Sequence, residues 1–106
     1  MQKLYYADAY HHVYNRGTLR STIFWGDEDY LYFLNRLRKF KNRSKVKIIC
    51  YSLLTNHFHF IVKQTDNKLT IGDFISDLQN GHTKFINKKL ERTGVLFEGP
   101  AKSKFI

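Results

Sequence analysis

The alternation of apolar and polar positions along this chain predicts six elements of secondary structure. Apolar residues spaced three and four apart indicate two helices. The first opens at Asp27 and carries an apolar stripe to Phe40; the second opens at Thr70, with Asp73 completing a capping box, and ends at Gly94. Stretches rich in β-branched and aromatic residues indicate four strands, at 10–17, 45–54, 57–62 and 102–106.

The order of these elements, strand–helix–strand–strand–helix–strand, is typical of one fold class. It predicts a single α+β, ferredoxin-like domain over 1–106, in which two helices cover one face of a four-stranded antiparallel sheet. The other face of such a sheet stays open. Thr55 and Asn56 form a connection short enough to pair the second and third strands as a hairpin.

The third strand places two histidines on one side and aromatic residues on the other. Side chains alternate along a strand, so Phe58 and Phe60 point toward the helices while His57 and His59 point to the open face. Residues two apart lie roughly 6.5–7 Å from each other, and two imidazoles can converge from that spacing on one divalent ion. The alternative is a pair of partly exposed histidines without a ligand. His82, alone on the second helix, is predicted to lie at the edge of the core.

The first predicted strand ends in a polar loop. His12 and Tyr14 share one face of that strand, and its last residues predict a turn in which Gly17 adopts a positive φ. Arg16 and Arg20 in the loop are suited to binding phosphate, although exposed loop arginines are often solvated without a ligand. On the second helix, a glycine at position 81 is predicted to allow close packing against the sheet.

The chain is strongly basic for its length. Its 106 residues include 18 Lys+Arg and 9 Asp+Glu, a formal net charge of +9, and the sequence pI is near 9.8. This charge favours a polyanionic partner, and the interleaved Tyr and Phe favour nucleic acid over a purely solubilising charge. No apolar run approaches the roughly 20 residues that span a bilayer, and no signal peptide is recognisable, so no membrane partner is expected. Cys50 is predicted to be a reduced core thiol of a cytoplasmic protein.

Several motifs occur together in this sequence. The run from Tyr51 to His59 (YSLLTNHFH) contains a His-hydrophobic-His (HUH) motif. The other segments are 12–17 (HVYNRG), 23–24 (IF), 83–89 (TKFINKK) and 94–99 (GVLFEG). In this order, and over nearly the whole chain, they resemble the single-tyrosine HUH transposases, most closely the branch of REP-associated tyrosine transposases. The agreement of several motifs makes the resemblance specific, because His-x-His alone is not.

The resemblance implies DNA transposition on single-stranded or hairpin DNA by a monomer or homodimer. In the family, a tyrosine hydroxyl attacks a metal-polarised phosphate, leaving a 5′-phosphotyrosine and a free 3′-OH. Carried over, His57 and His59 would be the metal ligands for Mg²⁺ or Mn²⁺, of which Mn²⁺ is better suited to imidazole nitrogen. The candidate DNA contacts are Asn15, Arg16, Arg20, Lys84, Lys88, Lys102 and Lys104.

Two departures from the family pattern affect the expected activity. The family tyrosine and a helix-borne third ligand follow the last strand, whereas this sequence ends at Ile106, so no catalytic residue is expected within the chain. Tyr51 is a weak substitute because a strand residue is too rigid for the attack. Pro100 and Ala101 stand where relatives often have Arg-Phe, which removes a possible DNA contact.

Two other functions remain open at this point. One is a metal-independent module that binds single-stranded nucleic acid on a ferredoxin-like sheet, with bases stacked on exposed aromatic residues. The other is a remnant that only dimerises.

Overall fold

The computed structural model describes residues 9–43, 46–64 and 71–106, apart from the side chains of 40–43 and 64. Lys45 and Thr70, at which the second strand and the second helix were predicted to begin, lie outside these residues. The observed order of elements confirms the predicted one. The elements are β1 (Tyr10–Arg16), the short 3-10 helix η1 (Thr18–Arg20), α1 (Asp27–Arg43), β2 (Val46–Leu54), β3 (His57–Gln64), α2 (Ile71–Lys89) and β4 (Lys102–Phe105).

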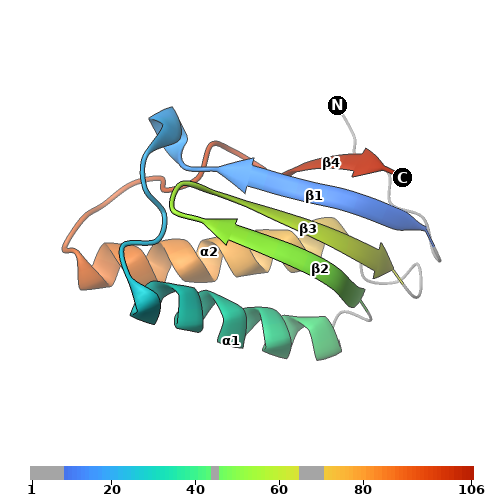
Figure 1. Cartoon of the computed structure of the whole chain (residues 1–106). Coiled ribbons are helices and arrows are strands. Elements are labelled where there is room, and N and C mark those ends of the chain that lie inside the picture. The colour runs from blue at the N-terminus through green and yellow to red at the C-terminus, as the bar shows by residue number, and fades with distance from the viewer. Residues whose placement is uncertain (1–8, 44–45, 65–70) are drawn as a thin grey trace.

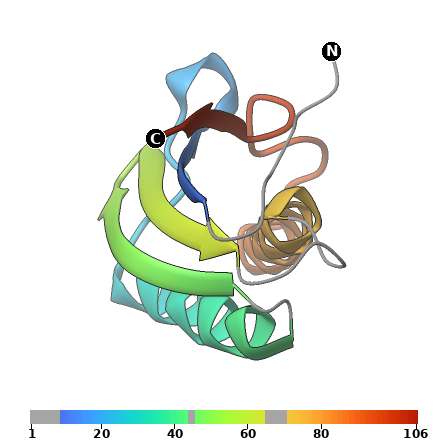
Figure 2. The same ribbon diagram turned by 90° about the vertical axis from the view of Figure 1, so that its right-hand side faces the viewer.

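The strands form one antiparallel sheet in the order β2-β3-β1-β4. Both helices lie on the same side of this sheet (Figure 1), and the view turned by 90° shows the sheet as a curved layer over them (Figure 2). The ferredoxin-like prediction is therefore confirmed. Because β3 and β1 are the two inner strands, each is hydrogen-bonded on both edges.

The core fills the space between the sheet and the two helices. Phe58, Phe60 and Val62 of β3 are fully buried, as the alternation predicts, and they pack with Val13 of the neighbouring inner strand. Full burial of such side chains contributes roughly 1.5–3 kcal/mol each. A slip of β3 by one residue would expose them and bury the histidines, so the core fixes which face carries the imidazoles.

The β2–β3 hairpin closes through Thr55 and Asn56, as predicted, with Leu54 paired to His57. The backbone N–H groups of Ile23 and Phe24 donate to the Thr55 carbonyl at 2.7 and 3.1 Å. The amide of Gly17 donates to the Asn56 carbonyl at 3.0 Å. The turn that precedes the histidines is therefore held by two other segments of the chain.

A register shift between Ile48 and Cys50 interrupts the pairing of β2 with β3. Ile48 pairs with Val62, whose side chain points toward the helices. Cys50 instead pairs with Ile61, which lies on the same open face of β3 as His59. Cys50 is exposed. The expectation of a core thiol was wrong because the bulge changes the face on which residue 50 lies.

Two predictions, about a turn and about the end of a helix, also need correction. Gly17 has φ −65, and the positive φ values fall on Leu19 (54) and Arg20 (59). Gly17 is needed for space, because a Cβ there would overlap the carbonyl oxygen of Ser21. α2 ends at Lys89, before the predicted end at Gly94.

The helices also differ in detail from expectation. Gly81 of α2 is close to the guanidinium of Arg36 on α1, so it serves packing between helices and not against the sheet. At the start of α1, Asp29 accepts a hydrogen bond from the backbone N–H of Trp25 at 2.7 Å. The carboxylate that caps the start of α1 is therefore that of Asp29. The predicted cap, Asp27, is exposed.

Candidate functional site

The two histidines of the motif lie together on the open face of the sheet. His57 and His59 are half-buried, and their ring centroids are 5.1 Å apart with the rings at 89°. The inner strand β1 places two more aromatic side chains beside them, His12 and Tyr14. We call the surface formed by these four residues the histidine face.

His12 makes a direct contact that the sequence analysis did not predict. Its Nε2 lies 3.0 Å from Nδ1 of His59, and the two rings stack at 5.2 Å. The ring of Tyr14 lies 4.9 Å from His12 and 6.0 Å from His59. The alternation of β1 already put His12 and Tyr14 on one face. Only the pairing of Tyr14 with His59 shows that this is the face of the HUH motif.

Asn56 fixes the orientation of the other motif histidine. Its Oδ1 lies 2.7 Å from Nδ1 of His57, while its Nδ2 donates to the carbonyl of Arg20 at 3.4 Å. An amide oxygen can only accept, so Nδ1 of His57 must carry the proton. Nε2 of His57 is then left with a free lone pair, as a metal ligand requires.

The surroundings of His59 favour its neutral form. Burial lowers its pKa below the ordinary value, and the neighbouring His12 and His57 lower it further. The neutral ring is the form that coordinates a metal ion. His82, by contrast, lies fully inside the core, where Nε2–H donates to the Ile23 carbonyl at 2.8 Å and burial lowers its pKa. It is a core residue, deeper than the predicted core edge.

A cavity of about 570 Å³ opens beside the motif histidines. Three cationic side chains, those of Arg16, Arg20 and Lys102, line it. Among the described residues, its lining consists of Tyr14, Asn15, Arg16, Arg20, Asn56, His57, His59 and Lys102. Cations beside two imidazoles suit an anionic ligand such as a phosphodiester.

The predicted DNA contacts at the end of β1 have different environments. Arg16 donates to Glu98 through two nitrogens, at 2.6 and 3.2 Å. This contact raises the pKa of Arg16 and lowers that of Glu98. Asn15 is buried, and its Nδ2 donates to Gln79 Oε1 at 2.7 Å and to the Gly99 carbonyl at 3.0 Å. Its amide nitrogen is thus engaged within the fold, and a direct DNA contact from Asn15 stays a prediction.

The predicted lysines divide between the two sides of the molecule. Lys102 and Lys104 of β4 pair with Tyr14 and His12, so they share the histidine face. Lys84 and Lys88 are exposed on α2, which covers the opposite side of the sheet. The structure therefore does not bring these two lysines to the motif histidines.

Tyr51 lies on the wrong side of the sheet for a role at the histidines. It pairs with Phe60, whose side chain is buried under the helices. Tyr51 also lines a hollow with Leu34 and Leu37 of α1. The structure separates Tyr51 from the motif histidines, which removes the geometric basis for treating it as a substitute nucleophile.

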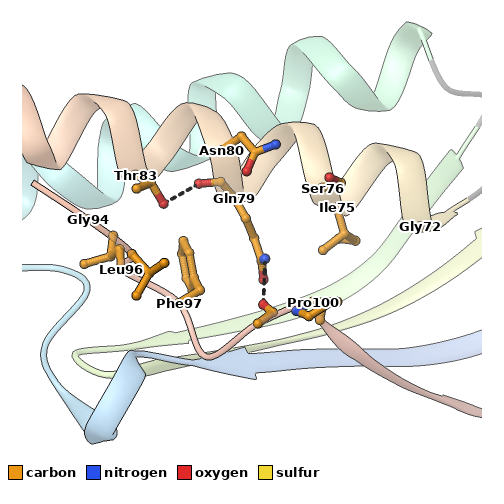
Figure 3. A pocket seen from close by; sticks show the side chains of 13 residues that line it. Gly72, Ile75, Ser76, Gln79, Asn80, Thr83, Gly94, Leu96, Phe97 and Pro100 are labelled. Carbon is orange, nitrogen blue, oxygen red and sulfur yellow. Dashed lines mark hydrogen bonds between the residues drawn. The ribbon is translucent and has the colours of Figure 1, made fainter. Parts of the chain in front are cut away.

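A second cavity, of about 550 Å³, lies between α2 and the segment that leads to β4. Figure 3 shows Ile75, Leu96 and Phe97 around it, with Gln79 reaching from the helix toward that segment. The part of its lining that the structure describes contains no histidine, cysteine, carboxylate or cation. This cavity therefore has no described side chain suited to binding a metal ion or a phosphate.

The histidine face offers two side chains that could hold a metal ion, those of His57 and His59. Over 9–43, 46–64 and 71–106, no group of three or more His, Cys, Asp or Glu side chains is arranged to hold one. Two imidazole ligands fit a weakly held divalent ion whose other positions go to oxygen ligands. Nitrogen donors favour Mn²⁺ over Mg²⁺ in such a site.

Comparison with known proteins identifies the family of this chain. Residues 5–100 match the family model described as "Transposase IS200 like", which covers most of the chain. The chain therefore belongs to the IS200-like transposase family. No curated protein matches it significantly.

Two solved structures share the fold. The structure of a REP-associated tyrosine transposase bound to a REP hairpin superposes with a TM-score of 0.81 at 12% identity. That comparison covers 100% of this chain and 61% of the other. A crystal structure of a protein assigned as a transposase from Deinococcus radiodurans R1 gives 0.71 at 14% identity, covering 100% and 86%. In the described part of the chain, none of the helices has the length and apolar character to cross a membrane.

Proposed function

We propose that this chain binds single-stranded DNA beside a hairpin and positions a phosphate on the histidine face for metal-assisted strand cleavage and joining. The observation that carries the proposal is the cavity in which His57 and His59 lie next to Arg20 and Lys102. Membership in a transposase family supports the strand-transfer chemistry. The likeness to a transposase bound to a REP hairpin supports a hairpin-bearing substrate.

Five residues of the cavity lining have a part in this proposal. His57 and His59 offer Nε2 atoms, and a divalent ion held there supplies Lewis-acid stabilisation of the charge on the phosphate. Arg20 and Lys102 neutralise neighbouring phosphates and fix the path of the strand. Asn56 holds the His57 ring in the tautomer that can ligate.

The attacking hydroxyl, in our proposal, does not come from the tyrosines of the described segments. Tyr51 faces α1, on the side of the sheet away from the histidines. Tyr14 lies on the histidine face, but its backbone is paired on both sides within the sheet and its ring contacts His12 and His59. Within the described segments, the histidine face thus binds and orients the strand, and neither Tyr14 nor Tyr51 forms the covalent intermediate.

A metal-independent nucleic-acid-binding module remains the second candidate, and one observation favours it. Tyr10 and Tyr14 both occupy the face of β1 that carries His12, and Tyr10 is 42% exposed. Exposed aromatic rings on a sheet can stack bases without any metal. The two candidates differ in whether Mn²⁺ strengthens binding through the motif histidines.

Fluorescence anisotropy with a labelled single strand that carries a hairpin tests the proposal. Binding is measured over a salt series with Mn²⁺ and with EDTA. We expect the dissociation constant to rise steeply with salt, since bound cations release counterions from the strand. We also expect Mn²⁺ to tighten binding to the wild type but not to the His57→Ala/His59→Ala variant.

Two charge-matched double variants locate the bound strand. Arg20→Gln/Lys102→Gln and Lys84→Gln/Lys88→Gln each remove two positive charges, the first from the histidine face and the second from α2. Each lost phosphate contact lowers the salt slope by about 0.7 on a single strand. We expect that reduction only for the first variant. An equal loss of salt slope in the two double variants, or no DNA binding at low salt, would contradict the proposal. DNA binding by the wild type that is equally tight with Mn²⁺ and with EDTA would favour the metal-independent module.

A further inference from the structure

Both motif histidines have a partner at the same ring atom. Nδ1 of His57 lies 2.7 Å from Asn56 Oδ1, and Nδ1 of His59 lies 3.0 Å from Nε2 of His12. Each ring therefore has its Nδ1 engaged within the protein, which leaves Nε2 as its ligating atom. The two partners differ in chemistry, because an amide oxygen accepts only, whereas an imidazole nitrogen can donate or accept.

This difference makes the tautomer of His59 depend on His12. If His12 donates from Nε2, then His59 Nδ1 is the acceptor, and the neutral His59 ring carries its proton on Nε2, where it cannot bind a metal. If His59 donates from Nδ1, then its Nε2 has a free lone pair. A neutral His59 that ligates through Nε2 is thus compatible only with His12 as the acceptor.

We propose that His12 is a positioning residue for His59: its Nε2 accepts the Nδ1–H hydrogen bond of His59 and so holds Nε2 of that ring ready to bind metal. The inference rests on the metal site of the proposed function. It gives the two motif histidines equivalent supports, Asn56 from the hairpin turn and His12 from the neighbouring inner strand.

The surroundings of His12 favour such a role. β1 is paired on both edges, with His12 opposite Ile61 of β3 and Lys104 of β4, so its backbone has a fixed register. The stacked rings of His12, Tyr14 and His59 restrict rotation of the imidazoles. A hydrogen bond between rings held in this way selects one orientation, and loss of such a support typically costs ~10–100-fold in metal affinity.

The test uses two substitutions at His12 that differ in acceptor capacity. In His12→Gln, an amide oxygen can replace the ring nitrogen as acceptor; His12→Leu removes the acceptor at similar size. Long-range ¹H–¹⁵N correlation spectra of the metal-free, histidine-labelled protein report the tautomer of His59. We expect the proton on Nδ1 in the wild type and in His12→Gln, and a shift toward Nε2–H in His12→Leu.

Mn²⁺ affinity, measured by water proton relaxation, gives the second readout. We expect it to weaken at least about tenfold in His12→Leu and to recover most of that loss in His12→Gln. The control is Lys104→Gln, which removes a cation opposite His12 and leaves the ring pair in place. Its His59 tautomer should match that of the wild type, and its affinity for Mn²⁺ should stay above that of His12→Leu.

The outcomes separate this inference from the proposed function. An Nε2–H tautomer of His59 in the wild type would overturn it, as would identical spectra and Mn²⁺ affinities for His12→Leu and wild type. Neither result would affect the measured binding of DNA. A wild type that takes up no Mn²⁺ overturns the metal part of the proposed function, and with it the ligand role that His12 is inferred to support.

Discussion

Arg16 and Glu98 are joined by two hydrogen bonds, at 2.6 and 3.2 Å, at the edge of the cavity beside the motif histidines. The pair places a carboxylate next to the surface on which a phosphodiester is proposed to lie. Glu98 thus offsets a cation that would otherwise be available to phosphate. Both side chains are partly exposed, so the contact is open to competition from a bound anion.

We expect Glu98→Gln to tighten DNA binding a few-fold and to increase the salt slope by about 0.7, because Arg16 gains a phosphate contact. Anisotropy over a salt series measures both quantities. Glu91→Gln, which removes an exposed carboxylate beyond the end of α2, is the matched control and should have a smaller effect. Weaker binding by Glu98→Gln would show that Glu98 positions Arg16 instead of competing for it.

Asp29 is fully buried and accepts a hydrogen bond from Lys89 Nζ at 2.7 Å. Burial would raise its pKa, but the hydrogen bonds from Lys89 and from the Trp25 amide more than offset this, so the pKa of Asp29 is lowered. A lowered pKa stabilises the fold above the unfolded value of about 3.9, and this contribution is lost as the pH falls through the folded-state pKa.

We therefore expect Asp29→Asn to reduce the free energy of unfolding by about 1–3 kcal/mol at pH 7. The difference from wild type should shrink as the pH is lowered below about 4. Urea unfolding at a series of pH values measures this. The control Asp27→Asn changes an exposed carboxylate at the same helix terminus and should have little effect. A difference that stayed constant down to pH 2 would exclude ionisation of Asp29 as the cause.

Gly17 approaches the carbonyl oxygen of Ser21 too closely to admit a Cβ. We expect Gly17→Ala to lower the free energy of unfolding by about 1–3 kcal/mol, as overpacking typically does. Gly26→Ala is the matched control, since a Cβ at Gly26 would meet no atom within 4 Å. Thermal or urea unfolding of the two variants compares them. Equal stabilities would mean that the loop relaxes without cost.

We expect no covalent adduct with DNA through Tyr14 or Tyr51, because Tyr51 pairs on the helix side of the sheet and Tyr14 is held between two paired strands. Without a positioned nucleophile, the reaction loses the ~7–11 kcal/mol that proximity and orientation can supply. The measurement is a denaturing gel after incubation with a hairpin-bearing single strand and Mn²⁺. An adduct that disappeared in Tyr14→Phe or Tyr51→Phe would identify a nucleophile that the proposal does not include.

The pattern of β3 was sufficient to predict much of the fold. Alternation alone put Phe58 and Phe60 in the core and His57 and His59 on the opposite face, because a strand has only two faces. The order of helices and strands then limited the topology to a familiar arrangement. These predictions depend on local periodicity, which a single sequence displays directly.

What the sequence did not reveal depends on contacts between distant segments or on local irregularities. The hydrogen bond of His12 to His59 requires the register of β1 against β3, which no local pattern determines. Asn15 looks like a polar surface residue until α2 brings Gln79 to it. The bulge in β2 moved Cys50 to the open side, and a backbone shift of this kind has no clear signal in composition or periodicity.

The supports of the two motif histidines differ in how they must form during folding. Asn56 is the sequence neighbour of His57, whereas His12 lies 47 positions from His59. Hairpins close within microseconds, but contacts between distant segments wait for the closure of longer loops. In a folding chain, the β2–β3 hairpin therefore presents one oriented imidazole before β1 has docked. If His12 supports His59 as proposed, the oriented pair of imidazoles exists only after the inner strands have joined, so uptake of a metal ion would report that β1 has docked on β3.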